Sequence, residues 1–244
     1  MEEYIYKFYA PTEYSFDALE KRYFWFSNPR YLNDPFDCNY DSFQSSNVFK
    51  NLSEEYRNRL LPFNEEMGIC SFTRSFENQH FWSLYADNYK GFCLVFDKSV
   101  LELRLSKLAM PIREVKYIDR SQFDFDTMFE SERNNGADFE TAFDRTLSKS
   151  AILKNRETWS TEEELRSVLG RIPMDGNNNI QKEAVGYKVP YSPSTPLVEV
   201  IMGHNMSPEH KQKIKQIVAS KYPTISIKQE YADVESWSIK KKEL

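Results

Sequence analysis

The chain has 244 residues, which is enough for one large domain or two small ones with a hydrophobic core. Its 32 basic and 37 acidic residues give a formal net charge of −5, so no surplus of positive charge draws it to nucleic acid or to an anionic membrane. The sequence shows no signal peptide and no apolar stretch near the roughly 18 residues of a membrane span, and its three cysteines lack metal or disulfide spacing, which together predict a cytoplasmic protein.

Apolar and aromatic patterning predicts the elements of the first half. We expect strands at 4–9, 24–26, 68–73, 91–97 and 112–118, and helices after Ser15, from about residue 52, and at 78–88. The continuous apolar run of residues 92–96 is typical of a central strand that is buried on both faces. Residues 31–47 are rich in Asn, Asp and Ser, which predicts a loop dense in turns.

The second half mixes helices and strands without regular alternation. We expect helical structure over 121–156, a strand that carries carboxylates over 159–168, a loop at 173–186, strands at 187–189, 197–203 and 225–229, and a helix over 207–221. No repeat or linker divides the chain. The sequence therefore predicts a single α+β domain over residues 1–244, built of two packed, mostly antiparallel sheets with flanking helices.

Two glutamates, Glu162 and Glu164, stand one residue apart in the expected strand. Side chains of an extended strand alternate between faces, so these two carboxylates are expected to lie together while Glu163 points to the opposite face. A solvated run of charge is the competing interpretation of the same pattern.

Five segments of the sequence resemble a widespread bacterial family that is described as a domain of unknown function. They are Tyr6–Tyr9, Phe26–Pro29, Asn33–Asp37, Trp82–Asp87 with Lys90–Cys93, and Trp159–Arg166. The resemblance extends over roughly residues 4 to 240, and Leu32, Tyr89 and Leu165 depart from the usual Phe, His and Trp. Many members of the wider family occur in bacterial toxin or anti-phage settings, so the resemblance implies an effector with an antitoxin or defence-system partner.

The order of the elements is also distantly similar to the catalytic core of ADP-ribosyltransferases, which implies that fold and NAD as the substrate. Gly68-Ile69-x-x-Phe72 resembles the strand that leads to the nicotinamide-stacking tyrosine, here Tyr85, although the spacing is four residues longer and a Ser-Lys-Ser helix start is missing. The Glu-x-Glu pair implies a catalytic Glu164 at the nicotinamide site and an acceptor-orienting Glu162. The residues implied to bind NAD are Tyr6, Lys7, Phe8, Ser27, Ser71, Tyr85 and Arg166. Arg166 is expected to pair with an acidic neighbour and so position Glu164, with phosphate contact as its second role.

Cleavage of the N-glycosidic bond of NAD passes through a ribosyl cation with nicotinamide as the leaving group. Such a site needs an anion near the ribose and hydrogen-bond donors for the amide. Glu164 suits the first task, and the Tyr6–Phe8 backbone with the hydroxyl of Ser27 suits the second; Lys7 would contact the phosphates. The acceptor would be a protein, a nucleic acid or water, the last giving an NAD glycohydrolase.

Two alternatives stay open at this stage. The first is a metal-dependent nuclease-type effector, because clustered carboxylates bind Mg²⁺; its candidate ligands are Asp34, Asp37, Glu162 and Glu164. The second is a non-catalytic binding or sensor module on the same fold. The three histidines are scattered, which argues against a zinc site, and the sequence lacks a glycine-rich phosphate loop.

Overall fold

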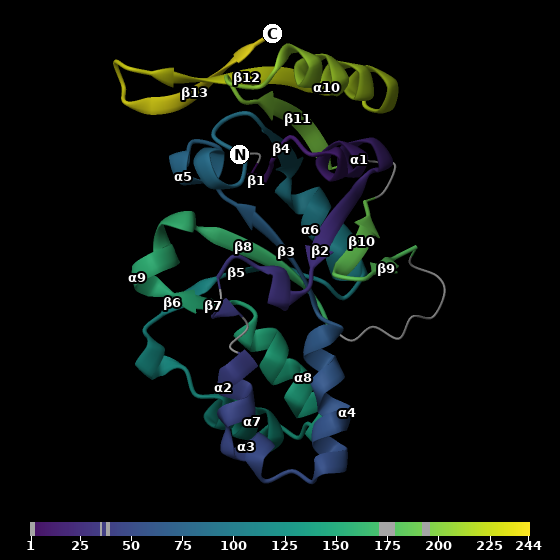
Figure 1. The fold of residues 1–244 in the computed structure, drawn as a ribbon, viewed down its shortest axis with the longest axis vertical. Coiled ribbons are helices and arrows are strands. Elements are labelled where there is room, and N and C mark those ends of the chain that lie inside the picture. The colour runs from purple at the N-terminus through teal and green to yellow at the C-terminus, as the bar shows by residue number, and fades with distance from the viewer. Residues whose placement is uncertain (1–2, 35, 38–39, 171–178, 192–195) are drawn as a thin grey trace.

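The computed structural model describes residues 3–34, 36–37, 40–170, 179–191 and 196–244. Most of its strands form one large mixed sheet, which gives an α+β fold (Figure 1). Along the main path the order is β13 (Ser238–Glu243), β12 (Ser226–Asp233), β11 (Leu197–Met202), β4 (Phe92–Asp97), β1 (Tyr4–Tyr9), β3 (Gly68–Thr73), β2 (Tyr23–Ser27), β10 (Gly186–Pro190) and β9 (Gln181–Glu183). Within this sheet only the β11–β12 pair is parallel among the described strands, so the predicted α+β class with largely antiparallel pairing is confirmed.

The large sheet forks at β3. One edge of β3 pairs along its whole length with β8 (Glu164–Leu169), which in turn pairs with β5 (Ile112–Glu114). The other edge meets β2 at Ile69 and β1 at Thr73. The prediction of two packed sheets is therefore corrected to one continuous forked sheet, because β1 and β2 each pair with only one end of β3. A separate small sheet consists of β6 (Lys116–Ile118) and β7 (Leu153–Asn155).

Helices cover both faces of the sheet around β4. On one face α1 (Glu13–Lys21), α6 (Lys98–Lys107) and α10 (Pro208–Lys221) pack on a core that includes Phe92 and Leu94. On the other face α5 (Gln79–Leu84) packs with Cys93 and Val95. Alternate residues of β4 thus enter different cores, and the predicted burial of this strand on both faces is confirmed.

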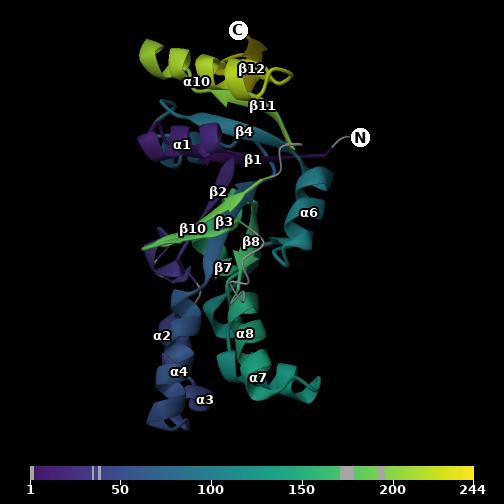
Figure 2. The same ribbon diagram turned by 90° about the vertical axis from the view of Figure 1, so that its right-hand side faces the viewer.

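A cluster of helices extends from one end of the sheet (Figures 1 and 2). It contains α2 (Tyr40–Ser45), α3 (Asn47–Lys50), α4 (Glu54–Glu65), α7 (Phe125–Asn134) and α8 (Phe139–Ser150). The side chains of Phe43, Phe125 and Phe143 meet in its core. Asp124 and Asp138 start the last two helices because their carboxylates accept backbone N–H groups of the first turn. The single domain over 1–244 stays a prediction.

Several expected boundaries differ from the structure. Helix α2 lies in the segment expected to be a loop, although positions 35 and 38–39 of that loop fall outside the described residues. The span expected to be helical over 121–156 ends instead in strand β7, and β13 was not predicted. Residues 173–178 of the expected loop at 173–186 are also outside the described part, and β9 follows within that range. None of the helices in the described segments has both the length and the apolar character that crossing a bilayer requires.

Candidate active site

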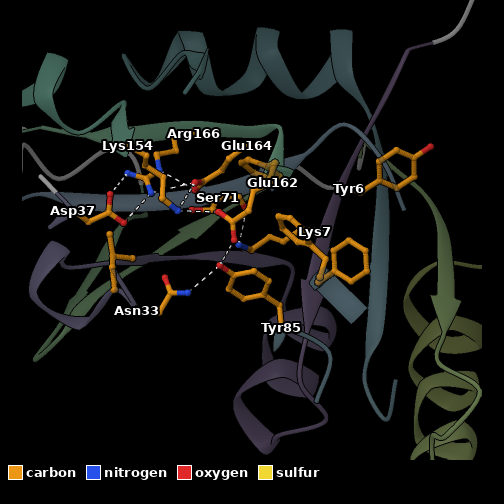
Figure 3. A pocket seen from close by; sticks show the side chains of 14 residues that line it. Tyr6, Lys7, Asn33, Asp37, Ser71, Tyr85, Lys154, Glu162, Glu164 and Arg166 are labelled. Atoms are coloured by element: carbon orange, nitrogen blue, oxygen red, sulfur yellow. Dashed lines mark hydrogen bonds and ion pairs between the residues drawn. The ribbon is translucent and has the colours of Figure 1, made fainter. Parts of the chain in front are cut away.

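A cavity of about 110 Å³ lies where β1, β3 and β8 meet (Figure 3). All of the predicted site residues except Ser27 line it, namely Tyr6, Lys7, Phe8, Ser71, Tyr85, Glu162, Glu164 and Arg166. Residues from the 31–47 segment and from β7 complete the wall, among them Asn33, Asp37 and Lys154. Segments far apart in the sequence therefore converge here, as the two sequence resemblances implied they would.

Strand pairing at the end of β3 brings β1 close to β8, the strand that carries Glu164. Thr73 is paired with Tyr6 of β1 on one side and with Glu164 of β8 on the other. The two outer strands lie on either side of β3, whose residues Ser71 and Phe72 line the cavity together with residues of both. From β1, Lys7 reaches across to donate a hydrogen bond of 3.0 Å to the carbonyl oxygen of Ser71.

Glu162 and Glu164 both face the cavity, but strand alternation is not the reason. Strand β8 begins at Glu164, whereas Glu162 ends a short 3₁₀ turn, η4 (Ser160–Glu162). Between them Glu163 has a left-handed backbone with φ of 46°, and its side chain is exposed. The hydroxyl of Thr73 donates to the carbonyl oxygen of Glu162 at 3.0 Å, which ties this turn to β3. The expectation that strand alternation aligns these two side chains is therefore wrong, whereas the expectation that both carboxylates point to the same side is confirmed.

Lys154 is a central residue that the sequence patterns did not reveal. Its Nζ donates to Glu162 Oε2 at 2.8 Å and to Glu164 Oε2 at 3.1 Å, so one ammonium joins both carboxylates. It also lies 4.2 Å from the centre of the Trp159 ring, a distance suited to a cation–π contact. The one available signal was a lone lysine directly after the apolar run Ala151–Leu153.

Arg166 is buried, and all five of its N–H groups donate hydrogen bonds. Two reach Glu164, from Nε to Oε1 at 2.8 Å and from Nη2 to Oε2 at 3.2 Å. Two form a bidentate pair with Asp37 at 2.7 and 2.9 Å, and one reaches the carbonyl oxygen of Ala151 at 2.8 Å. Its donors are used inside the protein, so the geometry suits the predicted positioning of Glu164 by an acidic pairing rather than the second predicted role, contact with the phosphates of NAD.

Three carboxylates and three cationic side chains line the cavity; the carboxylates are Asp37, Glu162 and Glu164, and the cations are Lys7, Lys154 and Arg166. Burial raises the pKa of Glu164, but the charges of Arg166 and Lys154 outweigh it, and the resulting pKa lies below the ordinary value of 4.5. Burial raises the pKa of Asp37, and Arg166 opposes this only in part. Glu164 is therefore a buried, ionised carboxylate on the wall of the cavity.

Tyr85 connects the aromatic side of the cavity to the carboxylates. Its hydroxyl donates to Glu162 Oε1 at 2.7 Å and accepts from Asn33 Nδ2 at 3.0 Å (Figure 3). Burial and the neighbouring charge of Glu162 raise the pKa of Tyr85 far above its ordinary value. The ring lies 4.9 Å from that of Phe81 one turn earlier. The predicted placement of Tyr85 beside Glu164 in one cavity is confirmed.

The segment after α5 has an unusual backbone. Asp87, Asn88 and Tyr89 are three consecutive left-handed residues, with φ of 46°, 52° and 64°. Such a backbone costs about 1–2 kcal/mol per residue for side chains with a Cβ. Hydrogen bonds from Tyr89 N to the Trp82 carbonyl at 3.0 Å and from Gly91 N to the Ala86 carbonyl at 2.8 Å hold it. This turn follows Tyr85 directly, so the segment from Trp82 to Gly91 serves to position that tyrosine.

One of the predicted NAD-binding residues, Ser27, is placed differently from expectation, whereas Tyr6 was expected to contribute through its backbone. Ser27 does not line the cavity, because β2 meets β3 at Ile69, the opposite end of that strand from Thr73. The hydroxyl of Ser27 donates instead to the carbonyl oxygen of Asn28 at 3.3 Å. Tyr6 lines the cavity, but its ring points away from the carboxylates (Figure 3) and packs on Phe76.

The arrangement of these carboxylates disfavours the alternative of a metal site. Asp34 does not line the cavity, and its Oδ1 accepts the backbone N–H of Phe36 at 2.9 Å. The ammonium of Lys154 and the guanidinium of Arg166 already lie between the remaining carboxylates. Within the described ranges, no group of three or more His, Cys, Asp or Glu side chains is placed to hold a metal ion.

Comparison with known families gives one match. Residues 81–167 match the sequence model of a family described as "Protein of unknown function (DUF2971)". The matched stretch includes Tyr85, Lys154 and the two cavity glutamates. It confirms the resemblance to a family of unknown function, while the likeness to ADP-ribosyltransferases stays a prediction. The comparisons with curated proteins and with solved structures found no match.

Proposed function

We propose that this cavity cleaves the N-glycosidic bond of NAD, as the site of an ADP-ribosyltransferase or an NAD glycohydrolase. The observation that carries the proposal is the buried, ionised carboxylate of Glu164, which Arg166 and Lys154 hold at the cavity wall. A fixed anion in a buried, poorly screened position stabilises a developing ribosyl cation more strongly than one in bulk water does. Because its position is set before substrate binds, little reorganisation is needed during the reaction.

The opposite wall of the cavity suits an aromatic ring. Phe8, Phe81 and Tyr85 line it, and stacking on such a ring contributes roughly 0.5–1.5 kcal/mol beyond burial of its area. The volume of about 110 Å³ is below the ~150 Å³ cavity known to hold benzene, so the cavity takes at most part of NAD and the rest of the dinucleotide lies outside it. The phosphates would lie near the ammonium of Lys7, which lines the cavity and donates to the carbonyl oxygen of Ser71.

The direct test compares two adjacent glutamates. Glu164→Gln removes the charge proposed to stabilise the transition state, and we expect turnover of NAD to fall by orders of magnitude with little change in KM. Glu163→Gln is the matched control, because its side chain is exposed and faces away from the cavity. Turnover is followed as nicotinamide release. Equal damage by both substitutions, or full activity of Glu164→Gln, contradicts the proposal.

An effector role in a bacterial cell follows if the activity is fast. Expression of the wild-type chain is then expected to lower cellular NAD and to stop growth, while expression of Glu164→Gln does neither. Co-expression of a neutralising partner would restore growth. Unchanged NAD levels during growth arrest would point to a different toxic activity.

A non-catalytic binding module is the second candidate, and one observation favours it. The network from Asp37 through Arg166, Glu164 and Lys154 to Glu162 is complete without any bound molecule. Complete buried networks also serve to fix a single packing arrangement. Calorimetry combined with the nicotinamide assay separates the two candidates, since a module binds NAD or nicotinamide while the wild-type chain releases no product.

A further inference from the structure

The surroundings of Glu162 limit which acceptor can take the ribosyl group. Only 4% of this residue is exposed. One of its carboxylate oxygens accepts from the Tyr85 hydroxyl at 2.7 Å and the other from the Lys154 ammonium at 2.8 Å. A carboxylate has about four lone-pair sites, so two stay available on Glu162, which is enough to orient one small donor.

Charge at this position disfavours a cationic acceptor. The ammonium of Lys154 contacts both Glu162 and Glu164, so any guanidinium or ammonium that approached Glu162 would lie beside a like charge in a poorly screened site. The cavity as a whole is formally balanced between three carboxylates and three cations. Because the developing ribosyl cation already draws on the charge of Glu164, no surplus negative charge remains to compensate for a further buried cation.

The volume of the cavity also favours a small, uncharged acceptor. A cavity of about 110 Å³ that part of NAD has already entered leaves room for a water, which needs ~10–15 Å³, and not for a whole protein side chain or base. Asn33 and Asp37 from the segment at one side are bound to Tyr85 and Arg166 across the cavity. These contacts narrow the approach for a macromolecule.

From these three observations we infer that the acceptor is water and that the chain is an NAD glycohydrolase, an inference that rests on the proposed function. The bond between C1′ of the ribose and the nicotinamide nitrogen breaks, and its electron pair goes to the ring. The water oxygen forms the new bond to C1′. The proton that the water loses passes to Glu162 and then to solvent, so each NAD yields nicotinamide, ADP-ribose and one proton.

The experiment offers the purified full chain a choice of acceptors. NAD labelled in its adenylate is incubated alone, with agmatine as a small guanidinium probe, and with a cell extract that supplies proteins and nucleic acids. We expect one free ADP-ribose for every nicotinamide released in all three mixtures, and a release rate that agmatine does not change. The Glu164→Gln variant sets the background, and Glu163→Gln is expected to match the wild type.

The possible failures can be told apart. Label on agmatine or on a macromolecule, together with nicotinamide release, overturns the assignment of water while leaving NAD cleavage intact. A lack of nicotinamide release from the wild-type chain in every mixture overturns the proposed function and this inference with it. Release matched by free ADP-ribose alone supports both.

Discussion

Tyr85 donates a hydrogen bond of 2.7 Å to Glu162, although the two residues are 77 positions apart in the chain. This contact joins the aromatic wall of the cavity to its carboxylates. It depends on the left-handed turn at Asp87–Tyr89, which follows Tyr85, and on the 3₁₀ turn that ends at Glu162. Two backbone features outside regular strands and helices thus determine how the site is closed.

Removal of this hydrogen bond gives the first prediction. Tyr85→Phe keeps the ring but leaves Glu162 Oε1 without its donor, and hydrogen bonds to charged groups contribute about 1.5–3 kcal/mol. We expect the free energy of unfolding in urea to fall by an amount in that range. Tyr14→Phe is the control, because that side chain is 84% exposed and its change is expected to be near zero. Equal effects of the two substitutions would show that the contact does not stabilise the fold.

The second prediction concerns the guanidinium of Arg166. Lysine keeps the charge but has a single compact ammonium, so it cannot bind Asp37 and Glu164 in the two forked pairs. We expect Arg166→Lys to destabilise the protein by about 3 kcal/mol, the scale of a broken buried ion pair. Arg156→Lys is the matched control, since that side chain is 58% exposed and pairs only loosely with Asp119. Urea unfolding of the two variants measures the difference, and a small loss for Arg166→Lys would contradict the assigned role.

Much of the sheet could be predicted from the sequence because its strands are strongly patterned. The ranges 4–9 and 68–73 agree with β1 and β3 at both ends, and 91–97 agrees with β4 within one residue. Aromatic and β-branched residues in short runs favour strands wherever they are paired. The fork at β3 was not predictable, because no local pattern in the sequence shows that β2 and β1 pair with opposite ends of the same edge of β3.

The site was predicted in its residues more than in its geometry. Glu162 and Glu164 lie together as expected, but a single left-handed residue between them, rather than strand alternation, produces that result. Lys154 escaped notice because its neighbours suggested the end of a helix. Its role arises from pairing of β7 with β6, a tertiary contact without a local pattern. Ser27 was misplaced for the same reason, because strand order decides which strand ends meet.

The third prediction tests the packing that holds the turn after Tyr85. A Cβ added at Gly91 would lie 2.0 Å from the carbonyl oxygen of Tyr9, which belongs to backbone and cannot move aside cheaply. We expect Gly91→Ala to destabilise the protein by about 3 kcal/mol, at the upper end of overpacking effects. Gly170→Ala is the control, since the nearest atom there is 3.7 Å away. Thermal unfolding measures this difference, and similar melting temperatures for Gly91→Ala and Gly170→Ala would contradict the expected destabilisation.

The last prediction is the pH dependence of stability that Glu164 causes. Its pKa in the folded protein lies below the ordinary 4.5, since Arg166 and Lys154 outweigh the effect of burial. The unfolded chain therefore takes up this proton at a higher pH than the folded protein does. The stabilising contribution of the ionised carboxylate is present above about pH 4.5 and is lost as the pH falls through the lowered value.

Urea unfolding of the wild type and of Glu164→Gln between about pH 7 and about pH 3 measures this contribution. We expect the wild type to be the more stable protein at neutral pH and the gap to narrow progressively on the acid side. Asp37, whose pKa burial raises, contributes in the opposite direction and is present in both proteins, so the comparison isolates most of the effect of Glu164. A gap that stays constant or widens as the pH falls would mean that Arg166 and Lys154 do not hold Glu164 in its ionised form, and the electrostatic basis of the proposed catalysis would fall with it.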